Sequence, residues 1–163
     1  MAKKERATLA QVLTPLLERE NISRRRIARE TDLSAKQVNI IFAGGAKHPY
    51  LHTLAVILRV LKASPQETER ALAAAGYPPK NTLGGAFARL ILKQEIWPKD
   101  LTPEYTVSPK SLTRILNNKS KALPQRHTVL TLLATIGATP KETTWVLRVG
   151  GYTGNQRFGT LHR

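Results

Sequence analysis

The side chains with the clearest chemistry lie in residues 23–42, which read SRRRIARETDLSAKQVNIIF. The outward positions of the second half of this stretch are short or carry hydrogen-bond donors and acceptors, and none is acidic: Ala35, Lys36, Gln37, Asn39 and Ile40. Arg24, Arg25 and Arg26 add three positive charges near its start. Side chains of these types bind a partner through hydrogen bonds and charge, without making or breaking covalent bonds.

No arrangement typical of a catalytic site occurs in the sequence. We find no nucleophile–base pair, no paired catalytic carboxylates, no phosphate-binding loop and no glycine-rich dinucleotide turn. His48 and His52 have the i, i+4 spacing of metal ligands, but Pro49 lies between them and the sequence has no cysteine to complete a site. We therefore expect a protein that is not an enzyme and needs no metal or cofactor.

The charge of the chain indicates an anionic partner. Its 163 residues contain 26 Lys and Arg against 11 Asp and Glu, for a formal net charge of +15. Nucleic acid, an anionic membrane surface or an acidic protein could balance this charge. Aromatic residues are only 6% and do not cluster, and no apolar run approaches the ~20 residues that span a bilayer. We therefore expect nucleic acid as the partner, with no membrane role and no small-molecule ligand, in the cytoplasm and at the nucleoid.

Two short helices must position the polar residues of this stretch. Ile27, Ala28, Leu33, Val38 and Ile41 recur at spacings that place them on the inner faces of two helices. A tight connection over residues 31–33 separates the helices, and Ser34 stands where a helix N-cap is expected. This arrangement predicts a helix-turn-helix, whose second helix lies in the major groove of DNA.

The sequence also contains an internal repeat, whose second copy follows the first at a shift of 74 and then 75 residues. Leu33-Ser34 recurs as Val107-Ser108, and Gly76-Tyr77 recurs as Gly151-Tyr152. Strand signals are missing, so the expected fold is all-α, with two tandem five-helix domains. The first covers residues 1–79, with a basic N-terminal tail at 1–7. The second covers residues 80–163 and ends in a short basic tail.

The second copy differs most in its second helix, which is expected over residues 98–105. Pro103 lies inside this helix, so it should be short, kinked or broken. The third helix has a strong start at Ser108-Pro109. Trp97 and Trp145 are interpreted as core or interface residues rather than as platforms for stacking bases.

These patterns resemble the lambda-repressor-like (Cro-type, Xre) helix-turn-helix family, once in each copy. In the first copy the resemblance is carried by Ile22-Ser23, Ile27-Ala28, Leu33-Ser34, Val38, Ile41-Phe42, Gly44 and Pro49. The second copy is the weaker match, because Pro98 and Thr102 replace the usual glutamine and alanine of the second helix.

The resemblance implies which residues approach DNA. Bases would be read by Ala35, Lys36, Gln37, Asn39 and Ile40, and in the second copy by Lys110, Ser111, Thr113 and Arg114. Phosphates would be bound by Arg24, Arg25, Lys47, Asn117, Asn118, Lys119, Lys121 and Arg126. Lysine and arginine can donate to guanine, and glutamine or asparagine can pair with adenine.

The expected function is that of a sequence-specific DNA-binding protein, a transcriptional regulator (repressor) of bacterial, phage or plasmid type. A homodimer is a possible assembly. Two alternatives stay open at this point. One is an architectural or plasmid-maintenance protein that coats or bridges DNA with two heads per chain. The other is an antitoxin-like protein in which one copy binds DNA and the other binds a protein.

Overall fold

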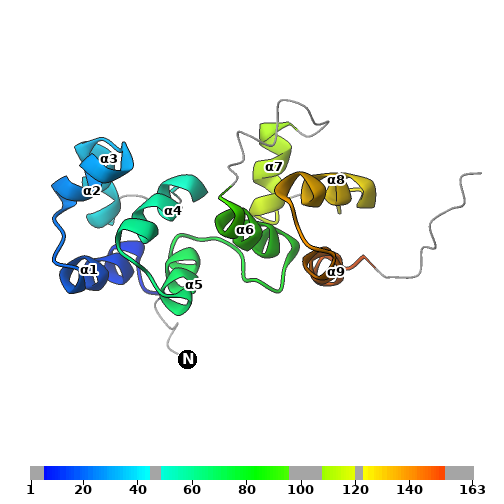
Figure 1. Ribbon diagram of the computed structural model, residues 1–163, viewed down its shortest axis with the longest axis horizontal. Coiled ribbons are helices and arrows are strands. Elements are labelled where there is room, and N and C mark those ends of the chain that lie inside the picture. The colour runs from blue at the N-terminus through cyan, green and yellow to red at the C-terminus, as the bar shows by residue number, and fades with distance from the viewer. Residues whose placement is uncertain (1–5, 45–48, 96–107, 120–122, 153–163) are drawn as a thin grey trace, which may run out of the picture. The chain divides into compact units, whose positions relative to one another are not determined.

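The computed structural model describes residues 6–44, 49–95, 108–119 and 123–152, and every regular element in these ranges is an α-helix (Figure 1). The all-α class is therefore confirmed for the described residues. None of the helices in these ranges is long and apolar enough to cross a membrane. The chain divides into two compact units, Met1–Tyr77 and Pro78–Arg163.

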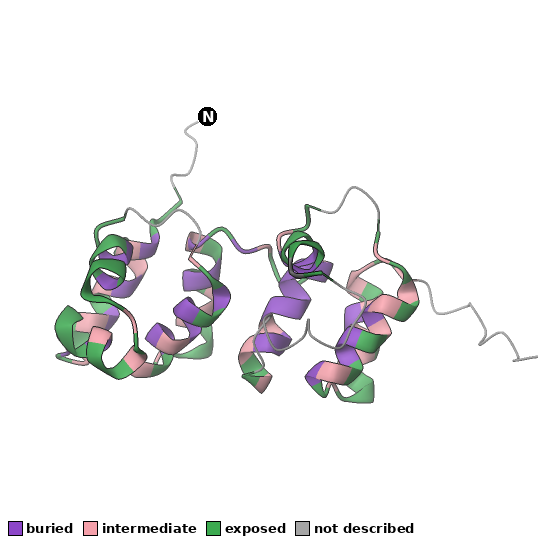
Figure 2. Cartoon of the chain, turned by 90° about the horizontal axis from the view of Figure 1, so that it is seen from above, coloured by how far each residue is buried: buried purple, intermediate pink, exposed green. Residues whose placement is uncertain are grey.

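The first unit contains five helices: α1 (Leu9–Arg19), α2 (Arg24–Thr31), α3 (Ala35–Phe42), α4 (Leu51–Val60) and α5 (Pro65–Ala74). Helix α1 packs on α3 and α5, and α2 packs on α3 and α4. The residues with no exposed surface that fill the space between these helices include Leu13, Ile27, Leu54, Ile57, Leu61 and Leu72. Figure 2 shows these buried faces turned toward the inside of the unit.

The described part of the second unit contains α6 (Leu83–Gln94), α7 (Pro109–Leu116), α8 (Arg126–Ile136) and α9 (Pro140–Val149). Helix α6 packs on α7, α8 and α9 around a core that includes Phe87, Leu112 and Leu132. The expected second helix of this unit, with Pro103 and Trp97, lies outside the described residues. The composition of five helices for this unit therefore stays a prediction.

The helix starts follow the sequence signals. The Oγ atoms of Ser34 and Ser108 each accept from the backbone N–H three residues later, so the predicted starts of α3 and α7 are confirmed. Ser64 caps α5 in the same way. Asp32 lies between α2 and α3 with φ = 55°, the left-handed region, which an Asp tolerates better than most residues that have a side chain. The sharp turn between the two helices thus forms without a glycine.

Backbone conformation repeats between the two units at the offsets seen in the sequence. Positive φ occurs at Asn21 and Glu95 and at Gly44 and Asn118, pairs that are 74 residues apart. It also occurs at Lys62 and Gly137 and at Gly76 and Gly151, pairs that are 75 residues apart. The last tyrosine of each unit donates its hydroxyl to a proline carbonyl, Tyr77 to Pro49 and Tyr152 to Pro124.

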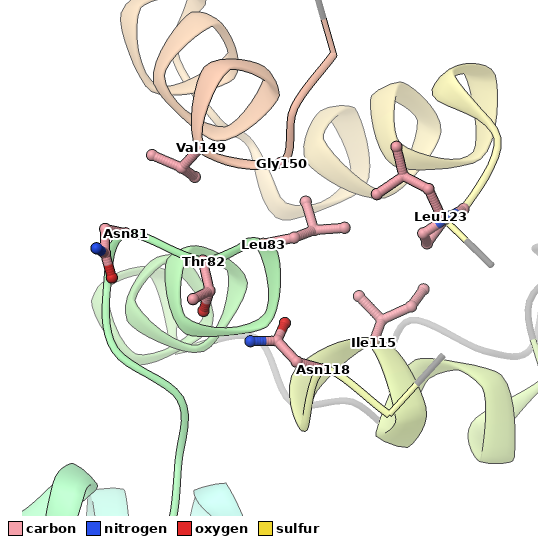
Figure 3. A pocket seen from close by; sticks show the side chains of 9 residues that line it. Asn81, Thr82, Leu83, Ile115, Asn118, Leu123, Val149 and Gly150 are labelled. Atoms are coloured by element: carbon pink, nitrogen blue, oxygen red, sulfur yellow. The ribbon is translucent and has the colours of Figure 1, made fainter. Parts of the chain in front are cut away.

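The start of α6 leaves no room for a side chain at two neighbouring glycines. A Cβ atom on Gly84 would lie 2.4 Å from the carbonyl oxygen of Ile115 in α7. A Cβ atom on Gly85 would lie 1.9 Å from the carbonyl oxygen of Pro79. The Oδ1 atom of Asn118 accepts from the Gly84 N–H at 2.8 Å, and Figure 3 shows the Asn118 side chain reaching from the end of α7 toward α6. The two glycines therefore fix how closely α6 approaches α7 and the chain before it.

The two prolines before α6 are hydrogen-bonded to the second unit. Arg89 Nη1 donates to the Pro78 carbonyl oxygen at 2.7 Å. Thr82 donates to the Pro79 carbonyl oxygen from its backbone N–H at 3.1 Å and from its hydroxyl at 2.7 Å. Both prolines fall in the second compact unit, Pro78–Arg163.

Equivalent ion pairs link the first and last described helices of each unit. Arg19 of α1 pairs with Glu67 of α5, and Lys93 of α6 pairs with Glu142 of α9. The backbone N–H of Ser64 and the Arg19 guanidinium lower the pKa of Glu67. The Lys93 ammonium group and the backbone N–H of Thr139 lower the pKa of Glu142.

We expect the first unit to lose stability as the pH falls through the ordinary carboxyl range. The pKa of Glu67 is lower in the folded state than in the unfolded state, so its contribution is present above the unfolded pKa and disappears on acidification. Thermal melting between about pH 6 and pH 3 should show a smaller decrease for Glu67→Gln than for the wild type. Glutamine keeps an acceptor for the Ser64 N–H but does not titrate. Equal pH dependence in both proteins would contradict the assignment.

Candidate nucleic-acid interface

Helix α3 turns the predicted base-reading residues to the surface. Val38, Ile41 and Phe42 are buried against the rest of the first unit. The other side of the helix is exposed at every predicted position: Ala35, Lys36, Gln37, Asn39 and Ile40. Ile40 is 42% exposed although it is apolar, so it offers a hydrophobic contact in the middle of a polar surface. We call these five residues the α3 face.

The side chain of Gln37 also takes part in the start of its own helix. Its Oε1 atom accepts from the Ser34 N–H at 2.9 Å, while its backbone N–H donates to Ser34 Oγ at 3.1 Å. This reciprocal pair is a capping box, in which each side chain accepts a hydrogen bond from the backbone N–H of the other residue. Lys36 and Asn39 make no such side-chain bond within the described part of the chain.

The three arginines at the start of α2 are in different environments. The guanidinium carbon of Arg24 lies 5.5 Å from the centre of the Phe42 ring, in a cation–π contact. Arg26 Nε pairs with Glu30 Oε1 at 2.6 Å. Arg25 is exposed and makes no hydrogen bond or ion pair with the described residues. Arg24 and Arg25 are the two of these three arginines that are predicted to bind phosphate. Arg25 is the one whose charge makes no such contact with the described residues.

Helix α7 has the same division into a buried and an exposed side. Leu112, Ile115 and Leu116 are buried, and the predicted base-reading residues are exposed: Lys110, Ser111, Thr113 and Arg114. Lys110 and Arg114 form no ion pair with the described residues. We call these four residues the α7 face.

The predicted phosphate-binding residues of the second unit fall into two groups. Lys119 is exposed, without an ion pair in the described part of the chain. Asn117 and Asn118 already use side-chain atoms inside the unit, since Asn117 Nδ2 donates to the Thr113 carbonyl oxygen and Asn118 Oδ1 accepts from Gly84. Arg126 is half-buried, and its Nε atom has no hydrogen-bond partner among the described residues. Lys47 and Lys121 lie outside the described residues, as does His48 of the discarded metal pair.

The N-termini of α4 and α8 have no side-chain cap. Tyr50 and Gln125 precede these helices, and neither side chain caps the helix, in contrast to the Ser and Thr caps elsewhere in the described residues. An uncapped helix N-terminus carries a partial positive charge and favours an anion such as phosphate. The absence of Ser, Thr, Asp or Asn before these helices was a signal available in the sequence.

The second unit also contains a cavity of about 300 Å³ between the start of α6 and the ends of α7 and α9 (Figure 3). The described residues that line it are largely apolar and none of them is charged: Asn81, Thr82, Leu83, Ile115, Asn118, Leu123, Pro124, Val149 and Gly150. The residues of the α7 face are not among them.

Both units carry an excess of positive charge. Residues 1–77 contain 13 Lys and Arg against 7 Asp and Glu, for a net charge of +6. Residues 78–163 contain 13 against 4, for a net charge of +9. The second unit is thus the more basic, although its resemblance to a helix-turn-helix domain is the weaker of the two.

Comparison with known proteins found a similarity for the first unit. Residues 12–68 match the family model of the Cro/C1-type HTH DNA-binding domain. The match starts within α1, ends within α5 and includes the whole of α2 and α3. No curated protein and no solved structure matches the chain.

Proposed function

We propose that this chain is a sequence-specific double-stranded DNA-binding protein that acts as a transcriptional regulator, a repressor of bacterial, phage or plasmid type. The observation that carries the proposal is the α3 face. It lies inside the stretch that matches a Cro/C1-type DNA-binding domain, each of its residues is exposed, and it contains donors and an apolar contact but no acid. These are the features that a helix needs to read base edges in the major groove.

The proposal includes the second unit as a second DNA-binding head that is a divergent copy of the first. Its support is the repeated set of positive-φ positions, the equivalent helix caps and the exposed, basic α7 face. Both units carry net positive charge, as binding to one polyanion by two heads requires.

The same charge favours a second candidate function, in which the protein coats or bridges DNA. The experiment that separates the two is footprinting on DNA that contains the region upstream of the coding sequence. A short protected site supports a regulator, whereas protection that spreads with protein concentration supports a coating protein. The absence of any protection at physiological salt would contradict both.

Within the first unit, Lys36 and Arg25 should contribute differently to binding. Lys36→Ala should lower the preference for the specific site over random DNA by ~1–3 kcal/mol, because a base contact discriminates between sequences. Arg25→Ala should weaken binding to both kinds of DNA alike, because phosphate carries no sequence information. A competition assay with specific and random duplexes measures both quantities. Identical effects of the two substitutions on the preference would contradict this division.

A further inference from the structure

The side-chain amide of Gln37 has one hydrogen-bonding atom in use and one free of any bond within the described residues. Its Oε1 atom accepts from the Ser34 N–H at 2.9 Å. Because the amide group is planar, the Nε2 atom then points away from this bond, and it has no partner among the described residues. Gln37 is exposed on the α3 face, in the first turn of the helix. The side-chain atom of Gln37 that has no bond within the described residues is therefore a donor, while Oε1 keeps only its second lone pair.

This geometry conflicts with the usual pairing of glutamine and adenine. That pairing is bidentate and needs Oε1 to accept from the adenine N6 amino group while Nε2 donates to N7. Here Oε1 already accepts from the Ser34 N–H, one of the orphan donors at the start of the helix. It could therefore accept from adenine only with its second lone pair, in the orientation that this bond imposes, or by leaving Ser34. In the second case the helix would lose half of its capping box at the moment of binding.

We propose that Gln37 acts as a donor-only residue that selects a carbonyl acceptor, guanine O6 or thymine O4, rather than adenine. Guanine presents two neighbouring acceptors in the major groove and thymine presents one, whereas adenine places an amino donor beside its acceptor and cytosine presents an amino donor. Asn39 on the same face has no engaged side-chain atom within the described residues, so the pairing with adenine is left to it. This inference rests on the proposed function and specifies which bases the α3 face selects.

The test uses the full chain and two glutamine-to-glutamate variants that add the same charge. Gln37→Glu keeps an oxygen acceptor for the Ser34 N–H but removes the Nε2 donor. Gln11→Glu is the matched control, because Gln11 is exposed and forms the same capping box with Thr8 at the start of α1, away from the α3 face. We expect both variants to melt at or above the temperature of the wild type, since a carboxylate suits a helix N-terminus.

The DNA measurements start from a random duplex library selected with the wild-type chain. We expect Gln37→Glu to lower the affinity for the selected site by at least about tenfold, and Gln11→Glu to lower it by less than about threefold. A second selection with Gln37→Ala identifies the base that Gln37 reads, as the position whose preference is relaxed. The wild type should require guanine or thymine at that position.

The outcomes separate this inference from the proposed function. Enrichment of adenine at the position relaxed by Gln37→Ala would overturn the donor-only role while leaving sequence-specific binding intact. A Gln37→Ala variant that relaxes no position would also overturn it. If the wild-type chain enriches no sequence at all, the proposed function fails first, and the inference fails with it.

Discussion

In the full chain, replacing Lys110 and Arg114 together by alanine should make DNA binding clearly less sensitive to salt. Both side chains are exposed on the α7 face without an ion pair in the described residues, so both charges are available to DNA. Each phosphate contact adds about −0.9 to the slope of log K against log salt. Loss of the second head should also weaken binding by up to about 10²–10⁴-fold, since linked heads bind with a high effective concentration.

A matched variant removes the same charge elsewhere on the second unit. Lys141 and Arg148 lie on α9, are exposed and form no ion pair with the described residues. Their double replacement by alanine should change the slope much less than the change on the α7 face. If both double variants flatten the slope equally, the second unit contributes only diffuse charge. If neither does, that unit does not touch DNA, and a protein-binding role becomes the better explanation for it.

Gly84→Ala should destabilise the second unit and leave the first unit unchanged. The added Cβ atom would lie 2.4 Å from the Ile115 carbonyl oxygen and 2.6 Å from that of Leu116, and backbone atoms cannot move aside as a side chain can. Overpacking of this kind costs about 1–3 kcal/mol, and alanine returns only about 1 kcal/mol through helix propensity. Displacement of α7 should also break the bond between Asn118 and the Gly84 N–H. Amide hydrogen exchange, resolved by segment, measures the two units separately.

Gly137→Ala serves as the control for this prediction. Gly137 is in the same unit with φ = 76°, and a Cβ atom there would meet nothing within 4 Å. Its replacement therefore adds backbone strain of about 1 kcal/mol without a steric clash. Gly84→Ala should be the more destabilising of the two, and it should reduce DNA affinity by displacing the α7 face. The reverse order of stability would show that α6 and α7 are not in contact as described.

The helices and their inner faces were predictable because both are encoded locally. Apolar spacing placed Ile27, Val38 and Ile41 inside, and Ser34 marked the start of α3. The capping box was also readable, since a serine followed three residues later by glutamine is its sequence signature. The role predicted for Gln37 was base reading only, although the same residue also caps α3.

Other features depend on contacts between residues distant in sequence, and no local pattern encodes them. The three adjacent arginines look alike in sequence, but Arg24 contacts Phe42, Arg26 pairs with Glu30 and Arg25 does neither. Asn118 is predicted to contact phosphate, and no local pattern indicates its bond to Gly84, 34 residues away. The roles of the base-reading and phosphate-binding residues toward DNA stay predictions, since the fold shows their exposure and not their partners.

The anchoring of Pro78 and Pro79 determines where the chain can be cut without damage. A fragment that begins at residue 80 would lose the two carbonyl oxygens that accept from Arg89 and Thr82. A fragment that ends at Tyr77 keeps the hydroxyl bond of that residue to Pro49. The single peptide bond between Tyr77 and Pro78 is therefore the place to divide the gene, to insert a spacer or to fuse either half to another protein.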